Sequence, residues 1–216
     1  MKNLMVPVAL LAVAVSGLSP AHAATYLPVG PQTNVSLSTV TGGGWTQCFQ
    51  QSFSTAFGIS ASTALSGCTG NTILLAGRET GSNTLLVLAQ ALKVDALFNT
   101  GAANNGITHI ANGTGWYNAD NWSWGFAPAG EAVAKFECDT NPGSGRICIH
   151  TLNVGGYRIN DTITFGAGFE KLVFSANAVS GAVPEPATWL MMILGFGLVG
   201  GAMRYRQRHP AKVSVG

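Results

Sequence analysis

Residues 112–126 carry the side chains whose types and spacing are best suited to binding chemistry. They read Asn-Gly-Thr-Gly-Trp-Tyr-Asn-Ala-Asp-Asn-Trp-Ser-Trp-Gly-Phe, with five aromatic residues among the last 11 positions. An aromatic ring offers a sugar an apolar face, while amide and carboxylate groups bond hydroxyls. We predict a weak glycan-binding platform in which Trp116 and Tyr117 stack on a sugar. Three polar side chains would contact its hydroxyl groups: Asn118, Asp120 and Asn121.

The same stretch has a second interpretation, as part of a protein core. Alternate residues of a strand face one side, so Trp122, Trp124 and Phe126 would share a face. Aromatic side chains supply large burial per residue, which suits such a face to the interior. Trp116 and Tyr117 are the better binding candidates, because they adjoin the polar loop residues.

Catalytic side chains are sparse in this chain. His109 and His150 are the only histidines between residues 24 and 183. The sequence has no G-x-S-x-G elbow of a serine hydrolase and no H-E-x-x-H zinc motif. We therefore predict that the domain is not an enzyme and has no cofactor, with a secreted hydrolase as the alternative.

The carboxylates do not change this expectation. No spacing singles out two of them for glycosidase chemistry. A calcium site around Asp139 and Asn141 is one interpretation of that loop, and a polar turn explains the same residues. We predict no metal site. The carboxylates considered are Asp120, Glu131, Glu137 and Asp139.

Short apolar runs separated by turn residues would position these side chains. Repeated strands at intervals of roughly 10 residues indicate a mainly β fold, a β-sandwich or jelly-roll-like domain with one or two short helices. Residues 85–97 also fit one helical face. A first edge strand is expected at 35–40, and the others at 72–76, 84–88, 95–98, 108–111, 122–126, 132–137, 146–152, 157–165 and 171–175.

Phe49, Phe53 and Phe57 lie four residues apart, which is the spacing of one helical face. We therefore predict a short helix within residues 47–65. A disulfide between Cys48 and Cys68 would tie its two ends together.

Four cysteines lie between the hydrophobic ends of the chain. An even number in an oxidising compartment favours two disulfides, for which three connectivities exist. The nearest-neighbour pairs, Cys48–Cys68 and Cys138–Cys148, would each close a modest loop. No pair has the C-x2-C spacing of zinc ligands.

The charges of residues 24–183 exclude one class of function. Six lysine and arginine residues stand against eight aspartate and glutamate residues, a net charge of −2. The whole chain has a net charge of +2, so its basic character belongs to the termini. A nucleic-acid-binding domain would carry a basic surface, and we predict no such partner.

The first 23 residues have the order of a secretory signal peptide. Lys2 precedes an apolar run at 4–15, and small residues around His22 end at Ala23. Signal peptidase would cut after Ala23 and release an exported chain. An uncleaved anchor is the alternative, but the run is short for a membrane span.

The C-terminal end combines three features. A Pro-Glu-Pro triplet at Pro184, Glu185 and Pro186 precedes an uncharged apolar run at 187–203. At about 1.5 Å per residue, a helix of this length reaches roughly 25 Å, the short end of what crosses a membrane. Arginines directly after the run favour a cytoplasmic tail at 209–216. These arginines are Arg204, Arg206 and Arg208.

The C-terminal segment resembles the PEP-CTERM sorting signal in its PEPxxWA variant. The likeness rests on the triplet, Trp189, Gly195-Phe196-Gly197 and the arginines, and it covers nothing upstream. It implies cleavage near the triplet by an exosortase, in systems often linked to exopolysaccharide and biofilm. The sequence departs from the pattern at Leu190 and in the residues that follow the arginines.

These features predict five segments and one sequence of events. A signal peptide (1–23) precedes an exported domain (24–175), a linker (176–183), a sorting signal (184–208) with a transmembrane helix (187–203), and the tail. The expected product is a cell-surface or matrix protein that passes through an inner-membrane intermediate and associates with exopolysaccharide. A chain held permanently in the membrane by its C-terminal helix, facing the periplasm, is a further alternative.

Overall fold

A computed structural model describes residues 24–164, 166 and 168–177, together with the isolated positions 193, 196 and 204. The chain divides into two compact units, Met1–Asn177 and Ala178–Gly216, and the fold described here is that of the first. Its described part contains two antiparallel β-sheets and three short helices. The helices are α1 (Leu37–Gly42), α2 (Ala61–Ala64) and α3 (Lys93–Ala96).

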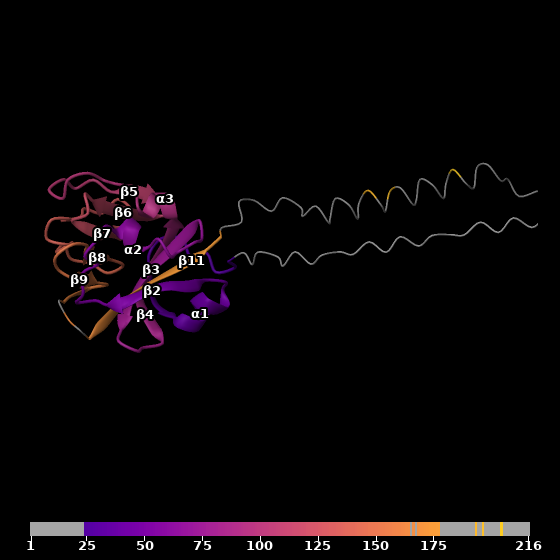
Figure 1. Ribbon diagram of the computed structural model, residues 1–216, viewed down its shortest axis with the longest axis horizontal. Helices are drawn as coiled ribbons and strands as arrows, with labels where there is room; N and C mark the ends of the chain where they lie inside the picture. The colour runs from indigo at the N-terminus through magenta and orange to yellow at the C-terminus, as the bar shows by residue number, and fades with distance from the viewer. Residues whose placement is uncertain are drawn as a thin grey trace, which may run out of the picture. The chain divides into compact units, whose positions relative to one another are not determined.

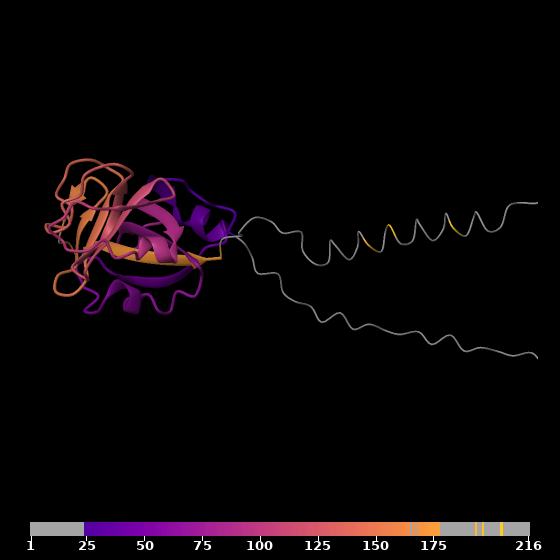
Figure 2. The same ribbon diagram turned by 90° about the horizontal axis from the view of Figure 1, so that it is seen from above.

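The first sheet has five strands in the order β1-β4-β3-β11-β2. The last strand, β11, lies between β3 and β2, so the chain enters this unit at one edge and leaves it from inside the sheet. In Figure 2 the orange β11 crosses the domain beside these earlier strands. The strands are β1 (Gln32–Ser36), β2 (Thr46–Ser52), β3 (Thr72–Glu79), β4 (Thr84–Leu92) and β11 (Phe169–Ala176).

The second sheet is a meander of six strands in the order β10-β9-β8-β7-β6-β5. Consecutive strands pair throughout, so this sheet lacks the long crossings of a jelly roll. Figure 1 shows it beside the first sheet. The strands are β5 (His109–Ala111), β6 (Thr114–Ala119), β7 (Ser123–Pro128), β8 (Ile147–His150), β9 (Gly156–Ile159) and β10 (Thr162–Ile163).

One hydrophobic core lies between the two sheets. Trp116, Trp124 and Phe126 of the second sheet belong to the same buried cluster as Ile73 and Val173 of the first. Trp116 and Phe126 meet edge to face with ring centroids 5.1 Å apart. The two sheets therefore pack face to face, as the predicted sandwich requires.

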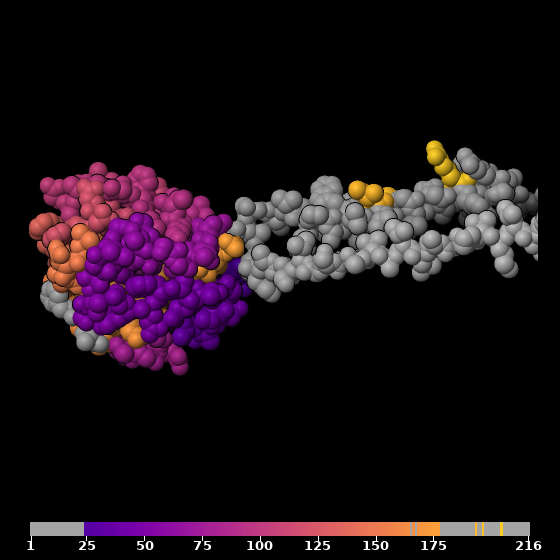
Figure 3. All heavy atoms as spheres, viewed as in Figure 1, coloured from indigo at the N-terminus to yellow at the C-terminus, as the bar shows by residue number. Residues whose placement is uncertain are grey.

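The outer face of the first sheet is also buried. Leu74, Leu172 and Phe174 on this face pack with Trp45 and with Ala24, the first described residue. Burial on both faces explains the short apolar runs inside these strands, residues 73–76 of β3 and 172–174 of β11. The N-terminal segments, indigo to purple, form most of the face seen in Figure 3.

An irregular segment at 129–145 covers the outer face of the second sheet. Val133 and Cys138 from this segment pack on Tyr117 of β6 and Cys148 of β8. Arg146 donates to both carboxylate oxygens of Asp139 at 2.9 Å. This buried ion pair and a disulfide hold the cover on the sheet.

The two predicted disulfides are confirmed. Cys48 pairs with Cys68 and Cys138 with Cys148, and no cysteine in the described part of the chain is free. The first bridge joins β2 to the segment after α2. The second joins the cover segment to β8.

The helix predicted within 47–65 is wrong over its first half, because Thr46–Ser52 forms β2 on the edge of the first sheet. Phe49 and Phe57 nevertheless meet, with ring centroids 5.2 Å apart. The chain reverses after β2 and brings the rings together without a helix. Only α2 (Ala61–Ala64) is helical there.

Three strand predictions also need correction. Residues 132–137 form no strand, because side chains satisfy their backbone: Asn141 and Arg146 donate to the carbonyl oxygen of Ala132, and Ser123 to that of Lys135. Residues 95–98 belong to α3 and the turn after it. The first strand lies at Gln32–Ser36 rather than at 35–40.

Within the described residues no helix is long and apolar enough to span a membrane. The predicted transmembrane segment at 187–203 lies outside those residues, apart from two isolated positions. The signal peptide at 1–23 lies outside them as well. These segments stay predictions from the sequence.

Lys171 is fully buried in β11 and fastens the loop after β2. Its ammonium group donates to the carbonyl oxygen of Ser52 at 3.0 Å and to that of Thr55, and lies 5.2 Å from the ring centre of Phe57. Burial lowers the pKa of Lys171 from 10.5 to about 8. The folded protein therefore loses this proton more readily than the unfolded chain does.

We compare the wild type with a Lys171→Met variant. The free energy of unfolding of the wild type minus that of the variant should become more positive as the pH rises from about 8 to 10.5. In this window the unfolded chain binds a proton that the folded protein has released, so the difference grows by at most about 1.4 kcal/mol per pH unit. Urea unfolding of both proteins at pH 7, 8, 9 and 10 measures it. A wild-type-minus-variant difference that stays constant or becomes more negative with pH contradicts the assignment.

Candidate functional site

The predicted sugar-stacking pair is not at the surface. Trp116 and Tyr117 are both 0% exposed, because both faces of the second sheet are covered. Trp116 points into the core between the sheets, and Tyr117 points under the cover segment. The prediction that their rings form a glycan platform is therefore wrong.

Tyr117 instead has a structural role. Its hydroxyl group donates to the carbonyl oxygen of Ile147 at 3.0 Å. A Cβ atom on Gly125 would lie 2.7 Å from that hydroxyl oxygen, so the glycine keeps this space open. Burial raises the pKa of Tyr117 well above its usual value, and the charge of Asp139 raises it further. The phenol is neutral at physiological pH.

The three predicted polar contacts divide between interior and surface. Asn118 is buried, and its side-chain amide donates to the carbonyl oxygen of Leu97 at 3.1 Å. Asp120 and Asn121 are exposed in the turn between β6 and β7, where both have positive φ values. Asp120 accepts a hydrogen bond from Asn99 at 2.9 Å.

This turn brings a different tryptophan to the surface. Trp122 is 37% exposed and stacks on Phe136, which is 54% exposed; their ring centroids lie 5.3 Å apart with planes at 13°. The indole nitrogen of Trp122 donates to the carbonyl oxygen of Phe136 at 2.9 Å, which fixes the orientation of the ring. The aromatic surface of this region is therefore built from Trp122 and Phe136.

His150 completes what we call the outer aromatic cluster: Trp122, Phe136 and His150. Its ring meets Trp122 edge to face with centroids 5.4 Å apart. Burial lowers the pKa of His150 below 6.5, so the imidazole is neutral at pH 7. Leu152 and Val154 are exposed and line a small hollow beside Trp122 and His150. The cluster is thus apolar and uncharged.

A larger hollow of about 390 Å³ has Phe136 in its lining. Residues 103–106 form one wall, and residues 133–137 form the other. Asn104 and Glu137 are exposed at its rim and can bond hydroxyl groups. A hollow of this size, next to two stacked rings, has room for a sugar residue.

Lys135 holds the two walls of this hollow together. Its ammonium group is buried and donates to the carbonyl oxygen of Thr100 at 3.3 Å and to the side-chain oxygen of Asn105. Burial lowers the pKa of Lys135, and the charge of Asp120 opposes this shift. The lysine is therefore a structural tie, and the hollow is formed before any ligand binds.

His109, the other histidine, lies apart from this cluster. It forms a pair with Asp95 at 2.8 Å and stacks on Phe98 with ring centroids 4.5 Å apart. A histidine and the carboxylate that orients it are two of the three groups of a catalytic triad, and the third is a nucleophile. Within the described residues every cysteine is in a disulfide, and no cluster of three His, Cys, Asp or Glu side chains could hold a metal.

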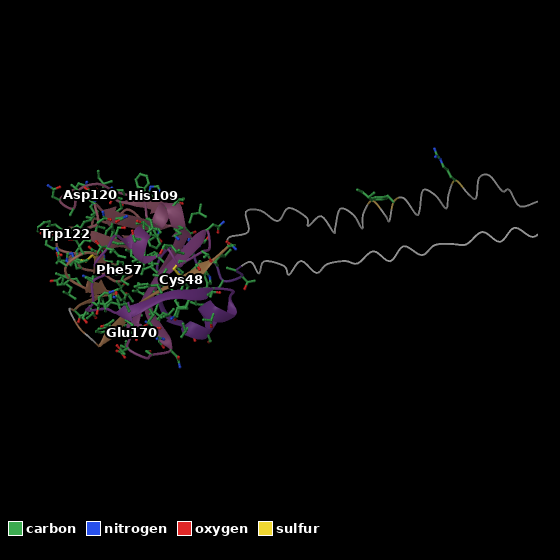
Figure 4. The ribbon with its side chains drawn as sticks, viewed as in Figure 1. Cys48, Phe57, His109, Asp120, Trp122 and Glu170 are labelled. Carbon is green, nitrogen blue, oxygen red and sulfur yellow. A yellow bond between two sulfur atoms is a disulfide. The ribbon has the colours of Figure 1, made fainter. Side chains whose placement is uncertain are left out.

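Figure 4 shows where these residues lie on the domain. Trp122 lies on the side opposite the end of β11, whereas Asp120 and His109 lie along the upper edge in this view. We call the side with Trp122 the outer pole.

Sequence reasoning missed Trp122 and Phe136 as surface residues. It placed Trp122 in a strand with Trp124 and placed Phe136 in a strand of its own. The available signal was Asp120-Asn121, a pair that readily adopts positive φ and ends the strand before Trp122.

The comparisons with known proteins concern the C-terminal segment alone. A family model described as the PEP-CTERM protein-sorting motif matches residues 182–207. The resemblance seen in the sequence is thus confirmed for this segment, which includes Pro184, Glu185, Pro186, Trp189 and Arg204. Comparison with curated proteins and with solved structures gives no match.

We expect Trp122 to be the tryptophan of the domain that iodide quenches. In the exported domain, Trp122→Phe should remove most of the quenchable fluorescence, because Trp45, Trp116 and Trp124 are at most 2% exposed. Trp45→Phe is the control and should leave the quenchable fraction unchanged. Quenching that survives in Trp122→Phe contradicts the assigned exposure.

Proposed function

We propose that this protein is a non-enzymatic surface protein, which an exosortase processes and whose outer aromatic cluster binds extracellular polysaccharide weakly. The PEP-CTERM motif implies export, membrane-associated processing with an exosortase as partner, and then the cell surface. The role of the β domain after delivery is the proposed part. The exposed stack of Trp122 on Phe136 is the observation that carries it.

The shape of the outer pole supports a sugar ligand. Aromatic faces attract the apolar faces of sugar rings, and Asn104, Glu137 and Asn153 lie near them at the rims of the two hollows. The rings are fixed by packing and by the Trp122 hydrogen bond, so binding does not have to order them. The exposed charges nearby, Asp120 and Glu137, are negative, which suits a neutral polymer better than a strongly anionic one.

A secreted hydrolase of extracellular polysaccharide is the second candidate. The contact between His109 and Asp95 is the observation that favours it. A hydrolase would also need a nucleophile or an acid–base partner beside that pair. Phe98, stacked on the imidazole, takes up one face of it.

We expect Trp122→Ala and Phe136→Ala each to weaken binding to the exopolysaccharide of the producing cell by about tenfold, or ~1.4 kcal/mol, as the stacking surface is removed. Affinity electrophoresis of the folded domain measures the change. Phe98→Ala is the matched control, since Phe98 is 52% exposed and lies outside the cluster.

Two outcomes contradict the proposal. Equal binding by wild type and both cluster variants would exclude the cluster as the site. Release of new reducing ends from the polymer by wild type, lost in His109→Ala, would establish the hydrolase instead.

A further inference from the structure

The end of the domain opposite the outer pole is built around the last residues of β11. Ser175 pairs with Ile73 on one side and with Thr46 on the other. The backbone N–H of Asn71 donates to the side-chain oxygen of Asn177 at 3.3 Å. The chain is therefore fixed in the fold as far as Asn177.

This end also tolerates little movement of β11. A Cβ atom on Gly70 would lie 2.4 Å from the carbonyl oxygen of Ala176, so the two backbones are in close contact. Ala176 belongs to the same buried cluster as Ala24, and Figure 1 shows both ends of the described chain on this side. Detaching the end of β11 would open the hydrophobic cluster beneath it.

The distance from this point to the sorting signal is short. Six residues, 178–183, separate Asn177 from Pro184. Even a fully extended chain places Pro184 at most about 25 Å from Asn177. A compact domain of this length is roughly 40 Å across. An enzyme that acts at the triplet must therefore work within about 25 Å of the end of β11, which is less than the width of the domain.

The surface around the end of β11 forms a hollow of about 390 Å³, which we call the base. Its lining contains no charged side chain, and several of its residues are glycines. Gln47 and Thr69 are exposed there. Small neutral residues let another protein surface approach closely, whereas anionic lipid headgroups would find no lysine or arginine to bind.

We propose that the base is a docking surface for the exported face of the membrane-embedded enzyme that processes the sorting signal. This inference rests on the processing described under the proposed function. The six-residue connection holds the base against the enzyme while the triplet is in its active site. The outer pole, on the opposite side of the domain, stays free during processing.

The test follows the conversion of the full-length precursor to its shortened form, by pulse labelling in cells that contain the enzyme. Gln47→Arg combined with Thr69→Arg should slow conversion about tenfold, because two large charged side chains then fill the contact. Thr140→Arg, an exposed change on the cover segment, should leave the rate unchanged. Limited proteolysis checks that each variant is folded.

A second variant separates docking from other effects. Inserting about ten Gly and Ser residues after Ser180 lengthens the connection, so the base is no longer held against the enzyme. The insertion should slow conversion of the wild type, and the double arginine change should then cause no further slowing. Deleting residues 178–180 should slow conversion of the wild type.

Three outcomes overturn the inference: a wild-type rate in the double arginine variant, an equal slowing by the double arginine change with and without the insertion, or faster conversion, which would indicate a lipid surface. If the wild-type precursor itself is never shortened, the proposed processing fails as well.

Discussion

The apolar layer between the two sheets is the interaction on which the rest of the structure depends. Each large side chain buried there contributes roughly 1.5–3 kcal/mol, and Trp116, Trp124 and Phe126 are fully buried. Both sheets are also covered on their outer faces, which leaves little room for aromatic side chains on the strands to reach solvent. The most exposed aromatic side chains of the described domain, Phe98, Trp122 and Phe136, therefore lie in turns and irregular segments. Trp122 and Phe136 lie in such segments, and this is why they, rather than the strand residues Trp116 and Tyr117, form the outer aromatic cluster.

The domain has few charged side chains, and several of the positive ones are used inside the structure. They donate hydrogen bonds to carbonyl groups of irregular backbone and hold it in place. Lys93, Lys135 and Lys171 each donate to main-chain carbonyl oxygens, and Arg158 donates to those of Asn141 and Asn160. Buried carbonyl groups outside strands need such partners, because an unpaired one costs about 1–3 kcal/mol. The tie at Lys135 fixes the segment that carries Phe136, so this part of the outer cluster has its shape before a ligand arrives.

The features that sequence predicted well are local ones. Alternating short apolar runs and turn residues indicated a β-rich fold, and nearest-neighbour spacing indicated both disulfides. The errors arose where contacts between residues far apart in the sequence decide the local structure or the burial of a side chain. The Phe49–Phe57 contact has helical spacing but is made by a chain reversal after an edge strand. The burial of Tyr117 depends on the cover segment, which is held by Arg146 and Asp139. The C-terminal motif was identified from its residues alone, since it is a linear order of residue types.

The two ends of the domain meet at its base, and the outer pole points away from them. A chain that is held at the membrane and then shortened at the Pro-Glu-Pro triplet would present the outer cluster to its surroundings throughout. The intact mass of the protein recovered from the surface of its own cells tests this account most directly. We expect a chain that begins at Ala24 and lacks Arg204 and everything after it. A mature chain that still carries residues 204–216 would contradict processing at the triplet.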